Sequence, residues 1–265
     1  MINFPNKFLG QVFLKSRKIT EEIVRAADIK SSDIILEVGP GKGILTEELV
    51  KKAKKVVAVE KDKRMVDYLK EKFSNQKNLE IIHDDILKFS IFNFQFSKYK
   101  IVANIPYYIT SRFLRKFLES DKQPSLMVLM VQKEVAERIV ARDKKESILS
   151  ISVKVYGQSK IIKKVPAKYF SPRPKVDSAV LLIDNISKDF FSAKGGSASG
   201  GRNIDEKKFF EMVKKGFSHK RKLLKSNLML DTECLTKCGV LEKARAEDLS
   251  PENWKCLYKN LYNLI

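Results

Sequence analysis

The stretch Ile-Ile-Leu-Glu-Val-Gly-Pro-Gly-Lys-Gly at residues 34–43 joins a short apolar run to a glycine-rich turn. A run of this length, followed by such a turn and then by an amphipathic segment, predicts a buried strand, a tight loop and a helix. Glycines let the backbone turn sharply and allow a ligand to approach the main chain. The stretch therefore predicts an α/β fold with a binding loop after its first central strand.

Similar apolar runs alternate with amphipathic segments along the first two thirds of the chain. We expect strands at 34–38, 56–60, 79–83, 100–103, 126–131, 148–155 and 179–183, and helices at 44–52, 64–73, 111–118 and 133–142. This alternation predicts a mostly parallel sheet covered on both faces, with ligands at the carboxyl ends of its strands.

The alternation stops after residue 183. Residues 194–201 read Lys-Gly-Gly-Ser-Ala-Ser-Gly-Gly, which is the composition of a flexible linker, and apolar residues recur at helical spacing beyond it. We expect a main domain over 1–185, a Gly/Ser-rich linker over 186–204 and a small all-helical domain over 205–265.

Charge is the strongest feature of the composition. The chain has 52 Lys and Arg against 32 Asp and Glu, a formal net charge of +20. This excess favours nucleic acid as a partner, although a general enrichment in lysine is the alternative explanation. No apolar run is long enough to span a membrane and no signal peptide is recognisable, so we expect a soluble cytoplasmic protein. Cys234, Cys238 and Cys256 form no CxxC pair, and with two histidines in the chain they predict reduced thiols and no metal site.

Glycine-rich loops that follow a strand commonly bind one of three kinds of ligand. A phosphate-binding P-loop is excluded, because Lys42 precedes Gly43 rather than a Ser or Thr. A dinucleotide loop has its third glycine one position later, so the loop alone leaves NAD open. The remaining candidate is S-adenosylmethionine, which carries no phosphate and would approach the main chain at Gly39 and Gly41.

Three carboxylates follow the predicted strands. Glu37 ends the first strand and suits a cationic cofactor, whereas Glu60 ends the second and could bind both ribose hydroxyls. Asp85 follows the third strand and could accept a hydrogen bond from an adenine amino group. Because an acid at Glu60 serves NAD equally well, these residues do not decide between the two cofactors.

Asn104-Ile105-Pro106-Tyr107 follows the fourth strand and suits methyl transfer to an exocyclic amine. The Asn104 oxygen and the Ile105 carbonyl could accept the N–H bonds of that amine, and Pro106 would stiffen the turn. Tyr107 offers a ring on which a flipped base could stack. A plain turn is the alternative, and the position after a strand next to the glycine loop argues against it.

A second aromatic residue lies in the segment Phe170-Ser171-Pro172-Arg173-Pro174-Lys175. Phe170 could face Tyr107 across the base, while Arg173 and Lys175 could contact phosphates; a rigid surface loop is the alternative. Farther on, Lys220, Arg221 and Lys222 lie in a stretch of basic residues that predicts RNA contacts, unless it is only a solvated helix face.

Together these motifs resemble those of the rRNA adenine N6,N6-dimethyltransferase family, over nearly the whole chain. The resemblance rests on Leu9-Gly10-Gln11-Val12-Phe13-Leu14, the 37–43 loop, the 104–107 turn, the segment 170–180 and the tail motifs at 217–222 and 246–250. It implies a class I methyltransferase fold with a seven-stranded Rossmann-like sheet and a helical C-terminal domain. It also implies cofactor contacts from Val12 and Leu14, beside those from Gly39, Glu60, Asp85 and Asn104.

The same resemblance implies a function. It points to the branch that dimethylates two adjacent adenines near the 3′ end of small-subunit rRNA, on the rRNA, the subunit or its precursor, with a role in subunit assembly. We expect a monomer. The alternatives are a large-subunit rRNA dimethyltransferase that confers antibiotic resistance and a mainly non-catalytic nucleic-acid-binding factor. One departure is Val12, where the family usually has Asn; it weakens a cofactor contact unless only backbone atoms are used there.

Overall fold

The computed structural model describes residues 10–93, 96, 98–192 and 203–262, and the glycine-rich run at 194–201 lies outside them. The chain divides into two compact units, which are described separately. The first unit comprises 1–136 with 158–186, and the second comprises 137–157 with 187–265. Residues 137–157, which we expected in the main domain, therefore belong to the second unit. In the described part of the chain no helix is both long and apolar enough to cross a membrane.

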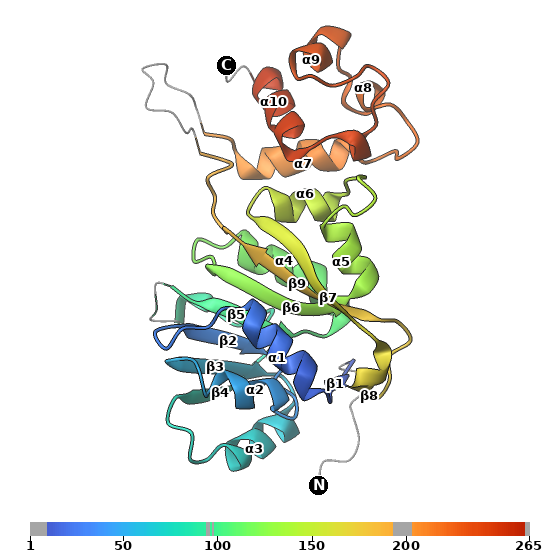
Figure 1. The fold of residues 1–265 in the computed structure, drawn as a ribbon. Coiled ribbons are helices and arrows are strands. Elements are labelled where there is room, and N and C mark those ends of the chain that lie inside the picture. The colour runs from blue at the N-terminus through green and yellow to red at the C-terminus, as the bar shows by residue number, and fades with distance from the viewer. Residues whose placement is uncertain (1–9, 94–95, 97, 193–202, 263–265) are drawn as a thin grey trace. The chain divides into compact units, whose positions relative to one another are not determined.

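A seven-stranded sheet forms the centre of the first unit (Figure 1). Its strand order is β4-β3-β2-β5-β6-β9-β7, and neighbours from β4 to β6 pair in parallel, while β9 is antiparallel to β6 and β7. The strands are β2 (Ile34–Val38), β3 (Lys55–Glu60), β4 (Leu79–His83), β5 (Lys100–Asn104), β6 (Leu126–Gln132), β7 (Gln158–Val165) and β9 (Ser178–Asp184). The expected α/β fold is confirmed.

Helices cover both faces of this sheet. Figure 1 shows α1 (Arg17–Ala26) and α2 (Ile44–Leu49) over the near face and α4 (Thr110–Leu118) behind the sheet, and α3 (Lys63–Lys72) packs along β3 and β4. Alternate strand residues such as Ile35, Val102 and Val180 join apolar residues of α1 and α2 in one core. Because side chains alternate between the two faces of a strand, every second residue of these strands lies on the face that α1 and α2 cover.

A short two-stranded ribbon lies beside the main sheet. In it β1 (Phe13–Leu14) pairs antiparallel with β8 (Phe170–Ser171), with Leu14 opposite Phe170. Both side chains are buried in the core under α1. The ribbon therefore holds the N-terminal motif beside the 170–178 segment, which is far away in sequence.

The expected strand at 148–155 is wrong: residues Ile148–Lys154 form helix α6 of the second unit. The alternation of Ile and Val with Ser and Lys resembles a strand, but a capping box starts a helix. The Ser147 hydroxyl accepts from Ser150 N at 3.1 Å, and Ser147 N donates to the Ser150 hydroxyl at 2.7 Å. The sequence does not predict strand β7, which lies at the edge of the sheet. Its lysines are typical of an edge strand and mask the alternation of apolar and polar residues.

The rest of the second unit is helical and has an aromatic core. Phe191, Phe209 and Phe210 contact one another, and Trp254 is fully buried. Its further helices are α7 (Glu206–Gly216), α8 (Leu224–Leu228), α9 (Thr232–Lys237) and α10 (Pro251–Leu261), and the end of α5 (Lys133–Ile139) also lies here.

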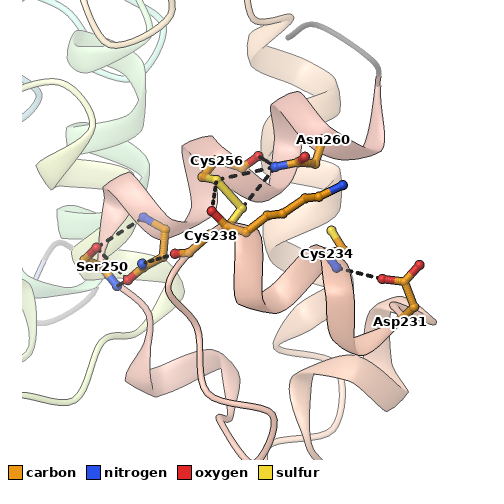
Figure 2. Close-up of a disulfide and its surroundings, with 8 residues drawn as sticks. Asp231, Cys234, Cys238, Ser250, Cys256 and Asn260 are labelled. Atoms are coloured by element: carbon orange, nitrogen blue, oxygen red, sulfur yellow. Dashed lines mark hydrogen bonds between the residues drawn. A yellow bond between two sulfur atoms is a disulfide. The ribbon is translucent and has the colours of Figure 1, made fainter.

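A disulfide joins Cys238, which follows α9, to Cys256 in α10 (Figure 2). The expectation of three reduced thiols is therefore wrong for two of them, and Cys234 is the free cysteine. The Asn260 amide donates to the Cys238 sulfur at 3.1 Å and to the Cys256 carbonyl at 3.0 Å. The 18-residue separation hid the pair, because the packing of α9 against α10 is what brings the two Cα atoms to 5.5 Å.

The disulfide can be checked by counting thiols. When the protein is denatured without a reductant and alkylated, we expect mass spectrometry to find one labelled cysteine, Cys234, and three after reduction. Reduction should also lower the melting temperature of the folded protein, because closing a loop of this size contributes about 3 kcal/mol. Three labelled thiols before reduction would contradict the assignment, and a Cys234→Ala variant that shows none is the control.

Candidate active site

A cavity of about 210 Å³ lies in the first unit, at the carboxyl ends of β2, β3, β4 and β5. Segments from all four strand ends and from the N-terminal motif line it. Most of the predicted site residues are among the lining residues: Val12, Leu14, Glu37, Gly39, Gly41, Glu60, Asp85, Asn104, Ile105, Pro106 and Tyr107. The structure thus brings together residues that come from five separate parts of the sequence.

Strand geometry places the polar side chains of the cavity. Ile35, Val56 and Val102 face the core under α1 and α2. Glu37, Glu60 and Asn104 follow them on the same strands by two, four and two positions, so their side chains lie on the same face. The strands that carry them are parallel neighbours in register. The three side chains therefore lie together on one face of the sheet, at the carboxyl ends of its strands and next to the apolar core.

The glycine loop follows β2 with positive backbone torsions. The φ angles are +63° at Gly39, +55° at Gly41 and +78° at Gly43, a region that side chains disfavour. A Cβ atom on Gly41 would lie 2.9 Å from Cδ1 of Phe13 in β1. The loop therefore needs glycine both for its turn and for the close approach of the N-terminal strand.

Glu60 is held in place by main-chain donors. Its carboxylate accepts from Gly41 N at 3.2 Å and from Asp62 N at 2.9 Å, and the side chain is buried. Burial raises the pKa of Glu60, and these N–H donors oppose the rise. The carboxylate is thus oriented by the same loop that forms the wall of the cavity.

Glu37 is the most buried ionisable group of the cavity, with 1% of its surface exposed. One oxygen accepts from the Thr46 hydroxyl at 2.7 Å, while Oε1 is buried and has no partner among the described residues. Burial, reinforced by the nearby charge of Glu60, raises the pKa of Glu37 to about 8. This orphaned oxygen is an acceptor available to a ligand with N–H groups or positive charge.

Asp85 also lines the cavity and is paired. Its carboxylate accepts from Lys61 Nζ at 2.8 Å and from Leu87 N at 3.0 Å. Burial alone would raise the pKa of Asp85, but the Lys61 hydrogen bond and the Leu87 N–H outweigh it and the pKa is lowered. Asp85 is therefore ionised, and an oxygen of it is already shared with a lysine at the cavity.

Asn104 ends β5 and reaches back to the N-terminal motif. Its Nδ2 donates to the Val12 carbonyl at 3.2 Å. With the donor end of the amide used in this way, the acceptor Oδ1 is free to face a ligand. The contact uses a backbone atom of Val12, so the replacement of the family's usual Asn by Val12 leaves it intact.

Ile105, Pro106 and Tyr107 continue from Asn104 along the wall of the cavity. Tyr107 begins a single 3-10 turn, and its hydroxyl lies 2.6 Å from the Ser178 hydroxyl. Burial raises the pKa of Tyr107, against the Ser178 hydrogen bond, so the phenol stays neutral. Tyr108 and Arg112 extend the wall toward solvent. They are residues that sequence reasoning missed, because no strand end or motif marks them.

The other predicted residues are not among those that line the cavity. Phe170 is 2% exposed, packs in the core with Leu14 and is not a lining residue, so its role beside Tyr107 stays a prediction. Arg173 and Lys175 are exposed in the first unit. Lys220, Arg221 and Lys222 are exposed in the second. Over the described residues, no group of three His, Cys, Asp or Glu side chains is placed to hold a metal ion.

The residues of the cavity fit S-adenosylmethionine better than a dinucleotide. Glu37, Glu60, Asp84 and Asp85 line the cavity. The oxygens of Glu37, Glu60 and Asp85 suit a sulfonium, an ammonium and ribose hydroxyls, and of the cations that also line the cavity, Lys61 is already bonded to Asp85. The unpartnered Oε1 of Glu37 points to the same class of ligand.

Comparison with protein families agrees with this chemistry. A family model described as ribosomal RNA adenine dimethylase matches residues 2–263. The small-subunit rRNA methyltransferase A of Dehalococcoides mccartyi is 42% identical over 261 residues, which cover 95% of this chain and 86% of that protein.

Solved structures give the same picture. A dimethyladenosine transferase from Plasmodium falciparum superposes with a TM-score of 0.77 at 27% identity, covering 95% of this chain and 98% of that one. The 23S rRNA methyltransferase ErmE superposes equally well, with a TM-score of 0.77 at 26% identity over 94% of this chain and 99% of that one.

Glu37→Gln is expected to remove a pH dependence of folding stability. Native Glu37 keeps its proton up to about pH 8, whereas the unfolded chain loses it near 4.5. Between these values the native state binds the extra proton, so stability falls as the pH rises, by at most about 1.4 kcal/mol per pH unit. Gln mimics the protonated acid and has no such loss.

Melting temperatures of both proteins at about pH 5.5 and about pH 7.5 test this linkage. The variant should be more stable than the wild type at both values, by about 1.4 kcal/mol at the lower pH and by a larger margin at the higher pH. Carboxylates with lowered pKa values, such as Asp85, stabilise above their unfolded pKa and are common to both proteins, so their effect cancels. A difference that does not change with pH would contradict the buried, protonated Glu37.

Proposed function

The chain belongs to the ribosomal RNA adenine dimethylase family, and on that premise we propose that it transfers methyl groups from S-adenosylmethionine to N6 of two adjacent adenines near the 3′ end of small-subunit rRNA. The single observation that supports this proposal most strongly is the geometry of Asn104. Its amide donor is bonded to the Val12 carbonyl, and its oxygen is left to accept an N–H of the target amine.

The N6 amine is a poor nucleophile because its lone pair is delocalised into the adenine ring. When Asn104 Oδ1 and the Ile105 carbonyl accept hydrogen bonds from the N–H groups of the amine, they favour the form in which the lone pair is localised on N6. Pro106 restricts the backbone of the turn that carries both acceptors. Tyr107 follows at once and supplies a neutral ring on which the flipped base can stack.

The bound cofactor supplies a methyl group that a sulfonium already activates. Glu37, Glu60 and Asp85 would hold it, through the orphaned oxygen, the ribose hydroxyls and the adenine amine respectively. Each transfer would form one N–C bond at N6, break the S–C bond to the methyl group so that the thioether S-adenosylhomocysteine leaves, and release one N6 proton to solvent. The residues therefore act by positioning, and a strong general base is not required.

The choice between the two ribosomal subunits rests on sequence similarity. The small-subunit methyltransferase of D. mccartyi is 42% identical, whereas the large-subunit enzyme ErmE is 26% identical, and both align over nearly the whole chain. We therefore favour the small subunit, or its precursor, as substrate and a cytoplasmic site of action. We also propose that the protein acts as a monomer, which light scattering can check.

Basic residues on both units are proposed to bind the RNA backbone. Arg173 and Lys175 lie on the exposed loop of the first unit, and Lys220, Arg221 and Lys222 on the exposed turn after α7 in the second. No carboxylate is found paired with these five in the described structure. Such lysines and arginines neutralise phosphates without reading sequence, so selectivity would come from RNA shape and the flipped adenine.

Asn104→Ala is expected to lower methyl transfer by at least about a hundredfold, because an acceptor aimed at the transition state is lost. The assay uses labelled S-adenosylmethionine and small subunits that lack these methyl groups, with nucleosides identified by mass spectrometry. Wild-type protein should yield N6,N6-dimethyladenosine at the 3′ end. Full activity of the variant would contradict the role of Asn104.

Large-subunit rRNA serves as the second substrate in that assay. Label there alone would move the protein to the large-subunit branch, and tight subunit binding without any label would indicate a non-catalytic factor. If the Asn104→Ala protein corrects a subunit-assembly defect in cells, binding contributes to assembly independently of methylation.

Replacement of Lys220, Arg221 and Lys222 by Ala should weaken rRNA binding while the affinity for S-adenosylmethionine is unchanged. We expect the slope of log affinity against log salt to fall by up to about 2 to 3, near 0.7 to 0.9 for each lost phosphate contact. Filter binding over a salt series measures it. A matched variant at Lys51, Lys52 and Lys54, which removes equal charge from the turn after α2, should keep the slope. An equal fall of the slope in both variants would show that net charge, and not contacts of these three residues with phosphates, accounts for the effect.

A further inference from the structure

Ser178 is a buried hydroxyl that touches Tyr107. It is fully shielded from solvent, and its Oγ lies 2.6 Å from the Tyr107 hydroxyl, a distance at which either group can donate. Neither the strand-end argument nor any motif role assigned it a function. The inference below rests on the proposed function, in which Tyr107 stacks on the target adenine.

The direction of β9 explains why Ser178 is at the site. The strand is antiparallel to β6, so its first residue pairs with Gln132 at the carboxyl end of β6. Val180 and Leu182 of β9 face the core under α1, and Ser178 has the same parity. Ser178 thus lies on the sheet face and at the edge where Glu37, Glu60 and Asn104 are placed.

The Tyr107 main chain is held as well. Its backbone carbonyl accepts from the Thr110 hydroxyl at 3.0 Å, which fixes the main chain but not the ring. The Ser178 hydrogen bond fixes the far end of the ring, at the hydroxyl. A ring held at both ends can present its face to a base with little loss of conformational freedom on binding.

The segment before Ser178 is itself anchored. The neighbouring Asp177 accepts from Ala167 N at 2.9 Å through its side chain and from Lys133 N at 3.0 Å through its carbonyl. The Ser178 hydroxyl therefore belongs to a fixed part of the backbone rather than to the exposed loop at 171–176.

We propose that Ser178 is a positioning residue, which holds the Tyr107 ring in the orientation that stacks on the target adenine. Its role is exerted through the Tyr107 hydroxyl alone. The segment that begins at Phe170 thus contributes the residue that orients Tyr107, the last residue of the 104–107 turn.

A double-mutant cycle tests the proposal. Tyr107→Phe keeps the ring and removes its hydroxyl, Ser178→Ala removes the partner, and a third protein carries both changes. We expect each single change to lower kcat on the rRNA substrate about tenfold, the usual effect of one hydrogen bond left unmade at a buried group. Because both remove the same bond, the double variant should be no slower than the slower single.

Two further measurements separate positioning from damage to the fold. The affinity for S-adenosylmethionine should be unchanged, since neither hydroxyl contacts the carboxylates of the cavity. Ser159→Ala is the matched control, because Ser159 lies on the neighbouring strand β7 and its buried hydroxyl has no partner in the described structure. It should keep the wild-type kcat.

The outcomes are distinct. A Ser178→Ala protein with kcat within about twofold of wild type, or single losses that multiply in the double variant, would overturn the inference. Should Ser178→Ala fail to fold, Tyr107→Phe decides, because it leaves β9 unaltered and an unchanged kcat would refute the role. An inactive wild-type protein would refute the proposed function and this inference with it, whereas an active wild type with unaffected variants would refute the inference alone.

Discussion

The hydrogen bond from the Asn104 amide to the Val12 carbonyl decides which atom of Asn104 faces the cavity. An amide has a donor end and an acceptor end, and commitment of the donor leaves the oxygen as the group that meets the ligand. The bond depends on two remote parts of the fold: β5 must end at Asn104, and the N-terminal motif must be held by the pairing of Leu14 with Phe170. A backbone carbonyl is the acceptor, so a valine at position 12 is sufficient.

Charge is distributed to suit two very different ligands. The chain carries a net charge of +20, yet four acidic residues, Glu37, Glu60, Asp84 and Asp85, line one cavity against three basic ones, Lys42, Lys61 and Arg112. Parallel strands produce this concentration, because their carboxyl ends meet at one edge and residues of one parity share one face. Carboxylate acceptors are thus gathered at the cavity, while exposed lysines and arginines elsewhere remain available to a polyanion.

The sequence predicts most of the residues that line this cavity because they lie at the ends of strands. Glu37, Glu60 and Asn104 end strands that the apolar runs made plain, and the glycine loop marks itself. Prediction from sequence fails where tertiary contacts decide. Residues 148–155 alternate in polarity as a strand does, whereas the capping box at Ser147 starts a helix. The Cys238–Cys256 pair depends on the packing of two helices. Ser178 was missed because β9 runs backwards, so that its first residue rather than its last reaches the site. Phe170 is buried beneath α1, and its role beside Tyr107, which rests on the motif alone, stays a prediction.

The most direct test is a crystal structure of the protein with S-adenosylhomocysteine and a short RNA that contains the target adenine. The account predicts that N6 of a flipped adenine lies within hydrogen-bond distance of Asn104 Oδ1, with Nδ2 still on the Val12 carbonyl and the base stacked on Tyr107. An adenine bound away from Asn104, or an Asn104 amide released from Val12 with its nitrogen toward N6, would contradict it.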